Sequence, residues 1–218
     1  MEIALRSVWH SYDGLTYALK DVSLTFRSPG VHVVVGPNGA GKTTLLKVVS
    51  LIIKPSKGLV LVNGQSFWDL DTSRRDAIRR AVVYVHDKPI LVRGTTRYNV
   101  ELGLKLRSEA DDSTVDYYIT RYGLKEVENK HVSKLSAGQA KTVSIIRALV
   151  LKPKVLVLDE PFTFLDSTRV ALLLEDITKL AEEGMVIVAT HYMQKSLRSI
   201  ASQVVEIING EVSSTEAK

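Results

Sequence analysis

The sequence predicts an α/β fold in which helices cover a mostly parallel sheet. The β-branched run 31–35 indicates a buried strand, and it leads through a glycine-rich loop into the start of a helix. In the second half, a helix over 143–151, a strand over 155–158, a helix over 170–183 and a strand over 185–189 alternate. Such alternation is typical of parallel sheets with helices on both faces.

The composition indicates a globular protein with a full core. The 218 residues suit one large domain, or one domain with an inserted lobe, and 45% of them are hydrophobic. No run approaches the roughly 18 apolar residues that span a bilayer. No signal peptide is visible, and the absence of cysteine excludes disulfides and thiol nucleophiles and suits a cytosolic protein. The net charge of +5 is scattered, so nucleic acid is not an expected partner.

The first part of the chain is expected to contribute an antiparallel β lobe. The alternation of apolar and polar residues over 1–27 predicts two strands joined by a turn near Asp13-Gly14. Tyr12 in this turn is an ordinary packing residue or an aromatic ring that stacks on a purine. Further on, a strand over 57–64 ends in an Asn-Gly turn, and a short helix closing at Arg80 precedes the strand 81–85.

A small helical lobe is expected over residues 93–134, between a core formed by 1–92 and 135–218. Thr95 or Thr96 is a candidate cap for its first helix, and Ser113 with Asp116 resembles a capping box for the second. After the core, a hairpin is expected around Asn209-Gly210 and a frayed polar tail over 213–218.

The glycine-rich loop fits the phosphate-binding pattern of Gly, four spacers, Gly, Lys and then Ser or Thr. Its glycines permit positive φ and let backbone N–H groups surround phosphate oxygens at a helix N-terminus. Lys42 is expected to bridge the β- and γ-phosphates of ATP, and the Thr43 hydroxyl to ligate Mg²⁺. The expected nucleotide-binding residues are Gly36, Pro37, Asn38, Gly39, Ala40, Gly41, Lys42, Thr43 and Thr44.

Two adjacent acids follow the strand 155–158, at the edge where ligands bind in such sheets. Asp159 is a candidate for holding hydrated Mg²⁺, and Glu160 for polarising an attacking water. The alternative is a pair of solvated turn acids. His191, after the strand 185–189, is a candidate for contacting a γ-phosphate or a structural histidine.

The segment Leu135-Ser136-Ala137-Gly138-Gln139 precedes the helix expected over 143–151. A serine and a glycine at a helix start offer hydroxyl and N–H groups to an anion. The residues alone are equally compatible with an N-cap and a glycine turn.

Taken together, these segments resemble the ATP-binding subunits of ABC transporters over essentially the whole chain. The segment 135–139, called the signature, distinguishes this family from other phosphate-loop NTPases. DNA-repair and chromosome-structure ATPases share the signature but carry a coiled-coil insertion before the two acids, and this chain has no such insertion. The matching segments are Tyr12 as the adenine-stacking residue, 36–44 as Walker A, 135–139 as the signature, 155–160 as Walker B, Leu165-Asp166 as the D-loop and His191 as the switch histidine.

The resemblance implies a head-to-tail homodimer, or a heterodimer with a related subunit, that sandwiches two ATP. Ser136, Gly138 and Gln139 would then act on the partner's nucleotide, with Asp166 nearby. Glu160 would be the general base. The resemblance implies transmembrane permease subunits as partners at the cytoplasmic face of the membrane, and an extracytoplasmic substrate-binding protein as a further candidate partner. The compact size resembles importers of tungstate, molybdate or phosphate.

The chain departs from the family pattern at four places. His86 stands where the family usually has a glutamine that approaches Mg²⁺ and the attacking water, so it is a candidate for catalysis and metal binding in that role. Ala137 replaces the first signature glycine, and Ala140-Lys141 and 201–203 also differ.

Two other classes remain open from sequence. One is a soluble ATPase of the iron–sulfur assembly type, without membrane partners. The other is a non-catalytic regulatory module, suggested by His86 but opposed by the intact Lys42, Asp159, Glu160 and His191.

Overall fold

The computed structural model describes residues 1–217, so Lys218 lies outside the described residues. The strands are β1 (Glu2–Ser11), β2 (Tyr17–Arg27), β3 (Gly30–Val35), β4 (Lys57–Val62), β5 (Gln65–Ser66), β6 (Val82–Val85), β7 (Val155–Asp159), β8 (Met185–Thr190), β9 (Gln203–Ile208) and β10 (Glu211–Ala217). The helices are α1 (Lys42–Val49), α2 (Thr72–Ala81), α3 (Thr96–Leu106), α4 (Asp112–Arg121), α5 (Ala137–Leu149), α6 (Ser167–Ala181) and α7 (Lys195–Ile200). Short 3₁₀ turns cover Phe67–Asp69, Lys125–Val127 and Val132–Lys134.

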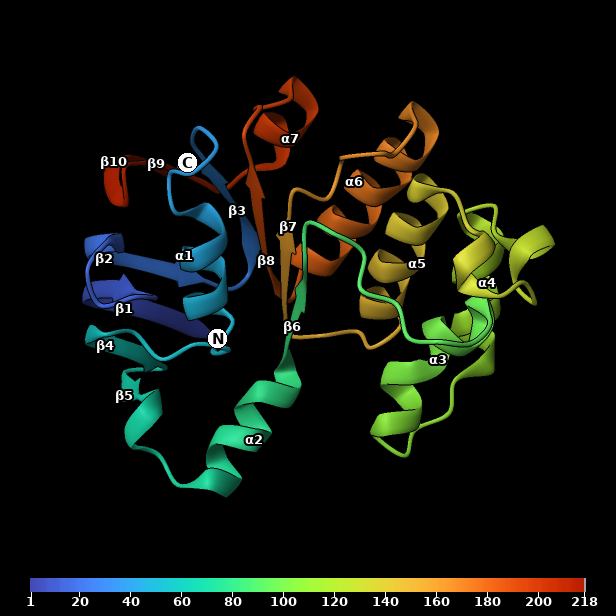
Figure 1. Cartoon of the computed structure of the whole chain (residues 1–218), viewed down its shortest axis with the longest axis horizontal. Helices are drawn as coiled ribbons and strands as arrows, with labels where there is room; N and C mark the ends of the chain where they lie inside the picture. The colour runs from blue at the N-terminus through green and yellow to red at the C-terminus, as the bar shows by residue number, and fades with distance from the viewer. Residues whose placement is uncertain (218) are drawn as a thin grey trace.

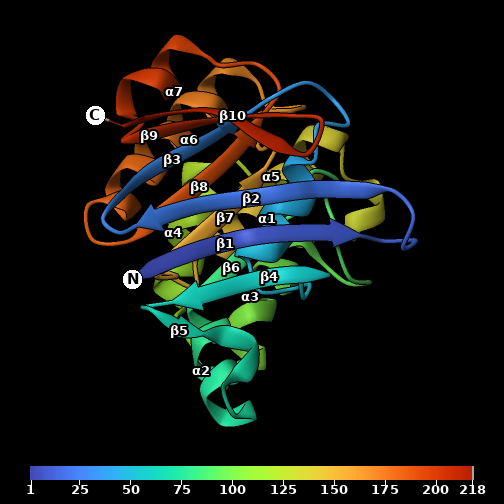
Figure 2. The ribbon, with the colours of Figure 1, turned by 90° about the vertical axis from the view of Figure 1, so that its left-hand side faces the viewer.

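The strands form two sheets. The order β2-β1-β4-β5 makes an antiparallel sheet, which faces the viewer in Figure 2. The order β10-β9-β3-β8-β7-β6 makes the central sheet, which is parallel except for β10. The predicted α/β class and the N-terminal antiparallel lobe are both confirmed.

Helix α1 lies between the two sheets, and α5 and α6 cover the other face of the central sheet (Figure 1). Successive side chains of a strand point to opposite faces of the sheet, so one central strand packs against α1 on one face and against α5 and α6 on the other. Val155 and Val157 belong to the apolar cluster that includes α1, whereas Leu156 and Leu158 belong to the cluster that includes α5 and α6. β7 is therefore apolar on both faces over 155–158, and its one acidic residue, Asp159, comes at its carboxyl end.

The segment 93–134 contains α3, α4, two 3₁₀ turns and one isolated bridge between Thr95 and His131. Helix α3 packs on α5, and Val100, Leu104 and Ile119 join the same apolar cluster as α5 and α6. Thr95 caps α3, as one of the two expected residues. Whether 93–134 behaves as a separate lobe remains a prediction.

Three local predictions are wrong. Helix α4 is capped by Asp111, not Ser113, because the Asp111 carboxylate accepts the Thr114 N–H. Helix α5 begins at Ala137, six residues before its apolar run, because a capping box at Ser136 starts it. The hairpin expected around Asn209-Gly210 is confirmed, but residues 213–217, expected as part of a frayed tail, are strand, because their backbone pairs with β9.

Candidate active site

The loop between β3 and α1 is shaped by glycines that contact neighbouring backbone. Gly41, the N-cap of α1, has φ 101°, and a Cβ there would lie 2.5 Å from the Ala18 carbonyl oxygen. A Cβ on Gly36 would lie 2.1 Å from the Ile207 carbonyl oxygen. The loop is thus pressed between β2 and the β9–β10 hairpin, and only glycine fits there.

Lys42 begins α1 and turns its side chain back over this loop. Its Nζ donates to the carbonyl oxygens of Gly36 at 2.9 Å and Pro37 at 3.1 Å. The residue is buried, with 7% exposure. The ammonium therefore lies over the same glycines whose N–H groups are expected to meet phosphate.

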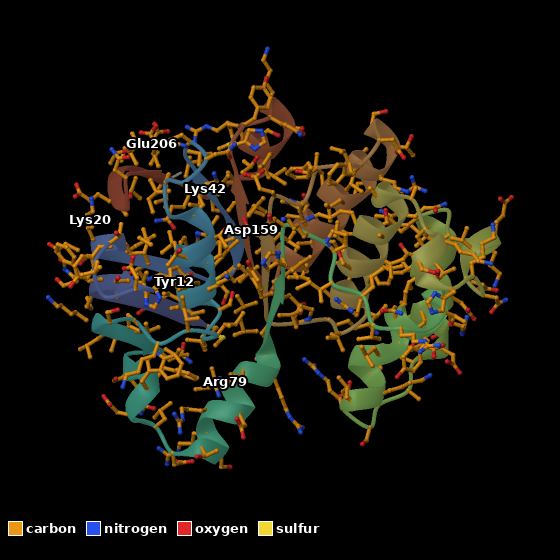
Figure 3. The ribbon with its side chains drawn as sticks, viewed as in Figure 1. Tyr12, Lys20, Lys42, Arg79, Asp159 and Glu206 are labelled. Atoms are coloured by element: carbon orange, nitrogen blue, oxygen red, sulfur yellow. The ribbon has the colours of Figure 1, made fainter. Side chains whose placement is uncertain are left out.

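Thr43 and Tyr84 converge on the carboxylate of Asp159 at the end of β7. The Thr43 hydroxyl donates to Oδ2 at 2.7 Å, and the Tyr84 hydroxyl donates to the same atom at 3.0 Å. Burial raises the pKa of Asp159, and these two hydrogen bonds only partly oppose the increase. Its Oδ1 is buried without a hydrogen-bond partner. Figure 3 shows Asp159 and Lys42 on neighbouring elements of the core.

Glu160 lies just beyond β7 and is held on both sides. Its Oε1 is 3.6 Å from Lys42 Nζ, and its Oε2 forms a hydrogen bond of 3.0 Å with Nδ1 of His191. Its backbone has a φ of 44°, an uncommon conformation for a residue with a side chain. The structure thus brings four predicted site residues, Lys42, Asp159, Glu160 and His191, to the carboxyl ends of β7 and β8.

The signature segment begins α5. The Ser136 hydroxyl accepts the Gln139 N–H at 3.2 Å, while Gln139 Oε1 accepts the Ser136 N–H at 3.0 Å. A Cβ on Gly138 would lie 2.6 Å from the carbonyl oxygen of Phe164, so the helix start packs on the loop before α6. Ala137 is exposed, which explains why a methyl group is accommodated there. Among the described residues, no hydrogen bond joins 135–139 to 36–44.

The other predicted residues have clear local partners. The Tyr12 hydroxyl forms a hydrogen bond of 3.3 Å with Thr44 Oγ1, and the residue is 62% exposed beside the loop. Asp166 caps α6 by accepting the Arg169 N–H at 2.9 Å, and this bond lowers the pKa of its carboxyl.

The structure does not bring the His86 side chain to the acids. Its ring contacts Tyr84 edge-on, and its Nδ1 lies against the Asp87 carboxylate and accepts the Lys88 N–H. Among the described residues, no hydrogen bond joins this side chain to Thr43, Asp159 or Glu160.

Sequence reasoning missed two residues at this site. Tyr84 supplies the second hydroxyl on Asp159, and Lys141 donates to the backbone beside it. Burial lowers the pKa of Lys141 to about 8. The available signal was a tyrosine one residue from the end of a strand next to β7, and a lysine two residues before the apolar run of α5.

Comparison with known proteins identifies the class of this fold and site. A family model for ABC transporters matches residues 19–163. A putative ABC transporter ATP-binding protein of Pyrococcus furiosus is 38% identical over 96% of this chain and 81% of its own length. The phosphate import ATP-binding protein PstB 2 of Natronomonas pharaonis is 32% identical over 96% of this chain and 78% of its own length. The dimeric ATP-binding cassette MJ0796, bound to ADP and Pi in a post-hydrolysis state, aligns with a TM-score of 0.88 at 27% identity, over 99% of this chain and 98% of that chain.

The chain therefore belongs to the ABC transporter family. It is the ATP-binding subunit of such a transporter and an ATPase. The transporter-subunit relatives favour this function over the soluble iron–sulfur assembly alternative. Within residues 1–217, no helix combines the length and the apolar character needed to cross a bilayer.

Proposed function

We propose that this ATPase subunit powers the import of a small inorganic anion, working as a dimer attached to transmembrane permease subunits at the cytoplasmic face of the membrane. The phosphate-import relative, similar over nearly the whole chain, supports this substrate class. The dimeric state of the MJ0796 cassette supports a dimer, either of two copies or with a related subunit. An extracytoplasmic binding protein is a further expected partner.

The observation that carries the catalytic proposal is the position of Glu160 between Lys42 and His191. The Glu160 carboxylate would accept a proton from the attacking water, and His191 would orient this carboxylate and contact the γ-phosphate. Lys42 would move from its loop carbonyls to the phosphates, which are better acceptors for an ammonium group. Tyr12 would stack on the adenine beside the loop.

The residues around Asp159 fit Mg²⁺. Asp159 Oδ1 is buried without a partner and the Thr43 hydroxyl lies on Oδ2, so two hard oxygen ligands are adjacent. Among residues 1–217, no cluster of three or more His, Cys, Asp or Glu side chains is placed to hold a metal ion, as expected for a cation that also takes water and phosphate oxygens. When bound, the ion would neutralise phosphate charge. His86 would need to turn away from Asp87 to join it.

The signature residues would act on the partner's nucleotide. Ser136, Gly138 and Gln139 form a helix start with exposed polar groups but make no hydrogen bond to the phosphate loop of their own chain. A head-to-tail partner would complete both sites, with Asp166 beside them. The segment 93–134 would move as a lobe. His86 lines a 270 Å³ cavity together with residues of α3 and α5, where this segment meets the core.

The substitution Glu160→Gln tests the catalytic assignment. The amide keeps the shape of the carboxylate but is a poor proton acceptor, so kcat should fall by about 100-fold or more while ATP binding persists. In the presence of ATP and Mg²⁺, the variant should accumulate as a dimer in size-exclusion chromatography.

Lys42→Ala is the matched control, because it should lose nucleotide binding and therefore the dimer as well as turnover. Parental kcat in Glu160→Gln would show that another group is the base.

The importer proposal is tested by tagging the chain in its native cell and identifying what co-purifies from gently solubilised membranes. We expect a polytopic membrane protein at comparable stoichiometry, together with an extracytoplasmic binding protein that binds an inorganic anion. Recovery of the chain with soluble partners alone would contradict the proposal.

A further inference from the structure

Lys141 is a fully buried lysine whose ammonium contacts only backbone carbonyls among the hydrogen bonds of the described residues. It lies in α5, two residues after Gln139, and has 0% exposure. Its Nζ donates to the carbonyl oxygens of Asp87 at 2.7 Å, His86 at 3.2 Å and Asp159 at 3.3 Å. An ammonium has three protons and no acceptor capacity, so these three carbonyls match its donors.

Burying a charge is costly unless it is fully hydrogen-bonded, and neutral alternatives would be cheaper at a purely structural position. The Lys141 ammonium joins two separate segments, the loop after β6 and the end of β7. These segments hold His86 and the acids of the site.

The contact with Asp159 fixes a single peptide unit. The Asp159 carbonyl and the Glu160 N–H belong to the same planar peptide bond. Lys141 donates to the carbonyl from α5, and the N–H donates to the Ala189 carbonyl of β8 at 2.9 Å. This peptide unit is therefore held at both ends by different elements.

Holding this unit matters because Glu160 has a φ of 44°. A residue with a side chain adopts such a conformation only where surrounding contacts enforce it. Loss of one of the two contacts would leave this peptide unit held at one end only, and would therefore loosen the placement of the Glu160 carboxylate between Lys42 and His191.

We propose that Lys141 is a positioning residue for ATP hydrolysis, which ties α5 to the loop at His86 and holds the Asp159–Glu160 peptide so that the Glu160 carboxylate faces the attacking water. The inference rests on the proposed role of Glu160. It also makes α5, which begins at the signature, a rigid connection between that segment and the acids of the same chain.

The test is Lys141→Met, which keeps the unbranched apolar part of the side chain and removes the ammonium with its donors. We expect kcat to fall about 10- to 100-fold, as a displaced catalytic group does, while the ATP dissociation constant stays within about twofold. Hydrogen exchange of the Glu160 amide should accelerate, with amides of the β3–β8 pairing unchanged. Lys141→Gln, whose amide retains donors on a shorter side chain, should recover part of kcat.

Ser144→Ala is the matched control, because its buried hydroxyl in α5 donates only to the Lys141 backbone oxygen among the described hydrogen bonds. This variant should retain the parental kcat and the parental hydrogen-exchange rate of the Glu160 amide. If Lys141→Met does not fold, the comparison is made with Lys141→Gln.

Three results for Lys141→Met would overturn the proposal. These are a kcat within twofold of the parent, an unchanged hydrogen-exchange rate of the Glu160 amide, or a rise in exchange at all amides together with equal losses of kcat and of ATP affinity. These results are distinguishable from failure of the catalytic assignment. Parental turnover in Glu160→Gln would refute Glu160 as the base, whatever the turnover of Lys141→Met. If Glu160→Gln is inactive and Lys141→Met is fully active, only the positioning role of Lys141 is refuted.

Discussion

At the scale of single residues, two glycines of the phosphate loop are required for different reasons. Gly39 and Gly41 both have positive φ, at 80° and 101°. A Cβ on Gly39 would meet nothing within 4 Å, whereas one on Gly41 would meet the Ala18 carbonyl oxygen. Alanine at Gly39 brings strain alone, and alanine at Gly41 adds a clash with backbone of β2.

We predict that Gly39→Ala lowers the free energy of unfolding by about 1–2 kcal/mol, the cost of a left-handed conformation for a residue with a Cβ. Gly41→Ala should cost distinctly more, because backbone atoms cannot move as a flexible side chain does. Urea unfolding of both variants without nucleotide measures the difference. Equal losses would mean that β2 yields to the added methyl group.

At the scale of elements, two aspartates anchor the helices around the segment 93–134 with opposite electrostatic consequences. Asp111 caps α4, and hydrogen bonds from the Thr114 hydroxyl, its N–H and Lys152 lower the pKa of its carboxyl. Asp176 in α6 is buried, and burial raises its pKa although the Tyr122 hydroxyl donates to it at 2.7 Å. The folded state therefore favours the ionised form of Asp111 and disfavours the ionised form of Asp176.

The two therefore predict opposite pH dependences of stability. Relative to Asp176→Asn, the parent's advantage is complete below the unfolded pKa of about 3.9 and is lost as pH rises through the raised native pKa. Relative to Asp111→Asn, the advantage is present above about 3.9 and is lost as pH falls toward the lowered native pKa. Urea unfolding across the acidic to neutral range measures both differences. Changes of the same sign in the two variants would contradict this assignment.

At the scale of the whole molecule, the predicted functional groups lie in two separate regions of the chain. The phosphate loop, the acids and His191 gather where β3, β7 and β8 end, whereas the signature begins α5 and packs on the loop before α6. The contacts of Lys141 connect these regions through the interior of one chain. A head-to-tail dimer would connect them a second time, across the nucleotide.

The sequence by itself determined the features whose physics is local. The phosphate loop requires glycines at set spacings before a helix, and apolar runs followed by polar residues marked the strands and the strand-end positions of Asp159 and His191. It also predicted the antiparallel lobe, because alternation along a strand reports burial of one face.

Only the tertiary structure decided the contacts between distant segments. Tyr84 meets Asp159 across 75 positions and Lys141 meets His86 across 55, and no local pattern encodes such pairs. Residues 213–217 likewise extend the second strand of the predicted hairpin because the edge of β9 offers unpaired backbone groups, not because of their own polar side chains. Local spacing thus predicted which residues would carry the chemistry, while packing of distant backbone determined how Glu160 is held.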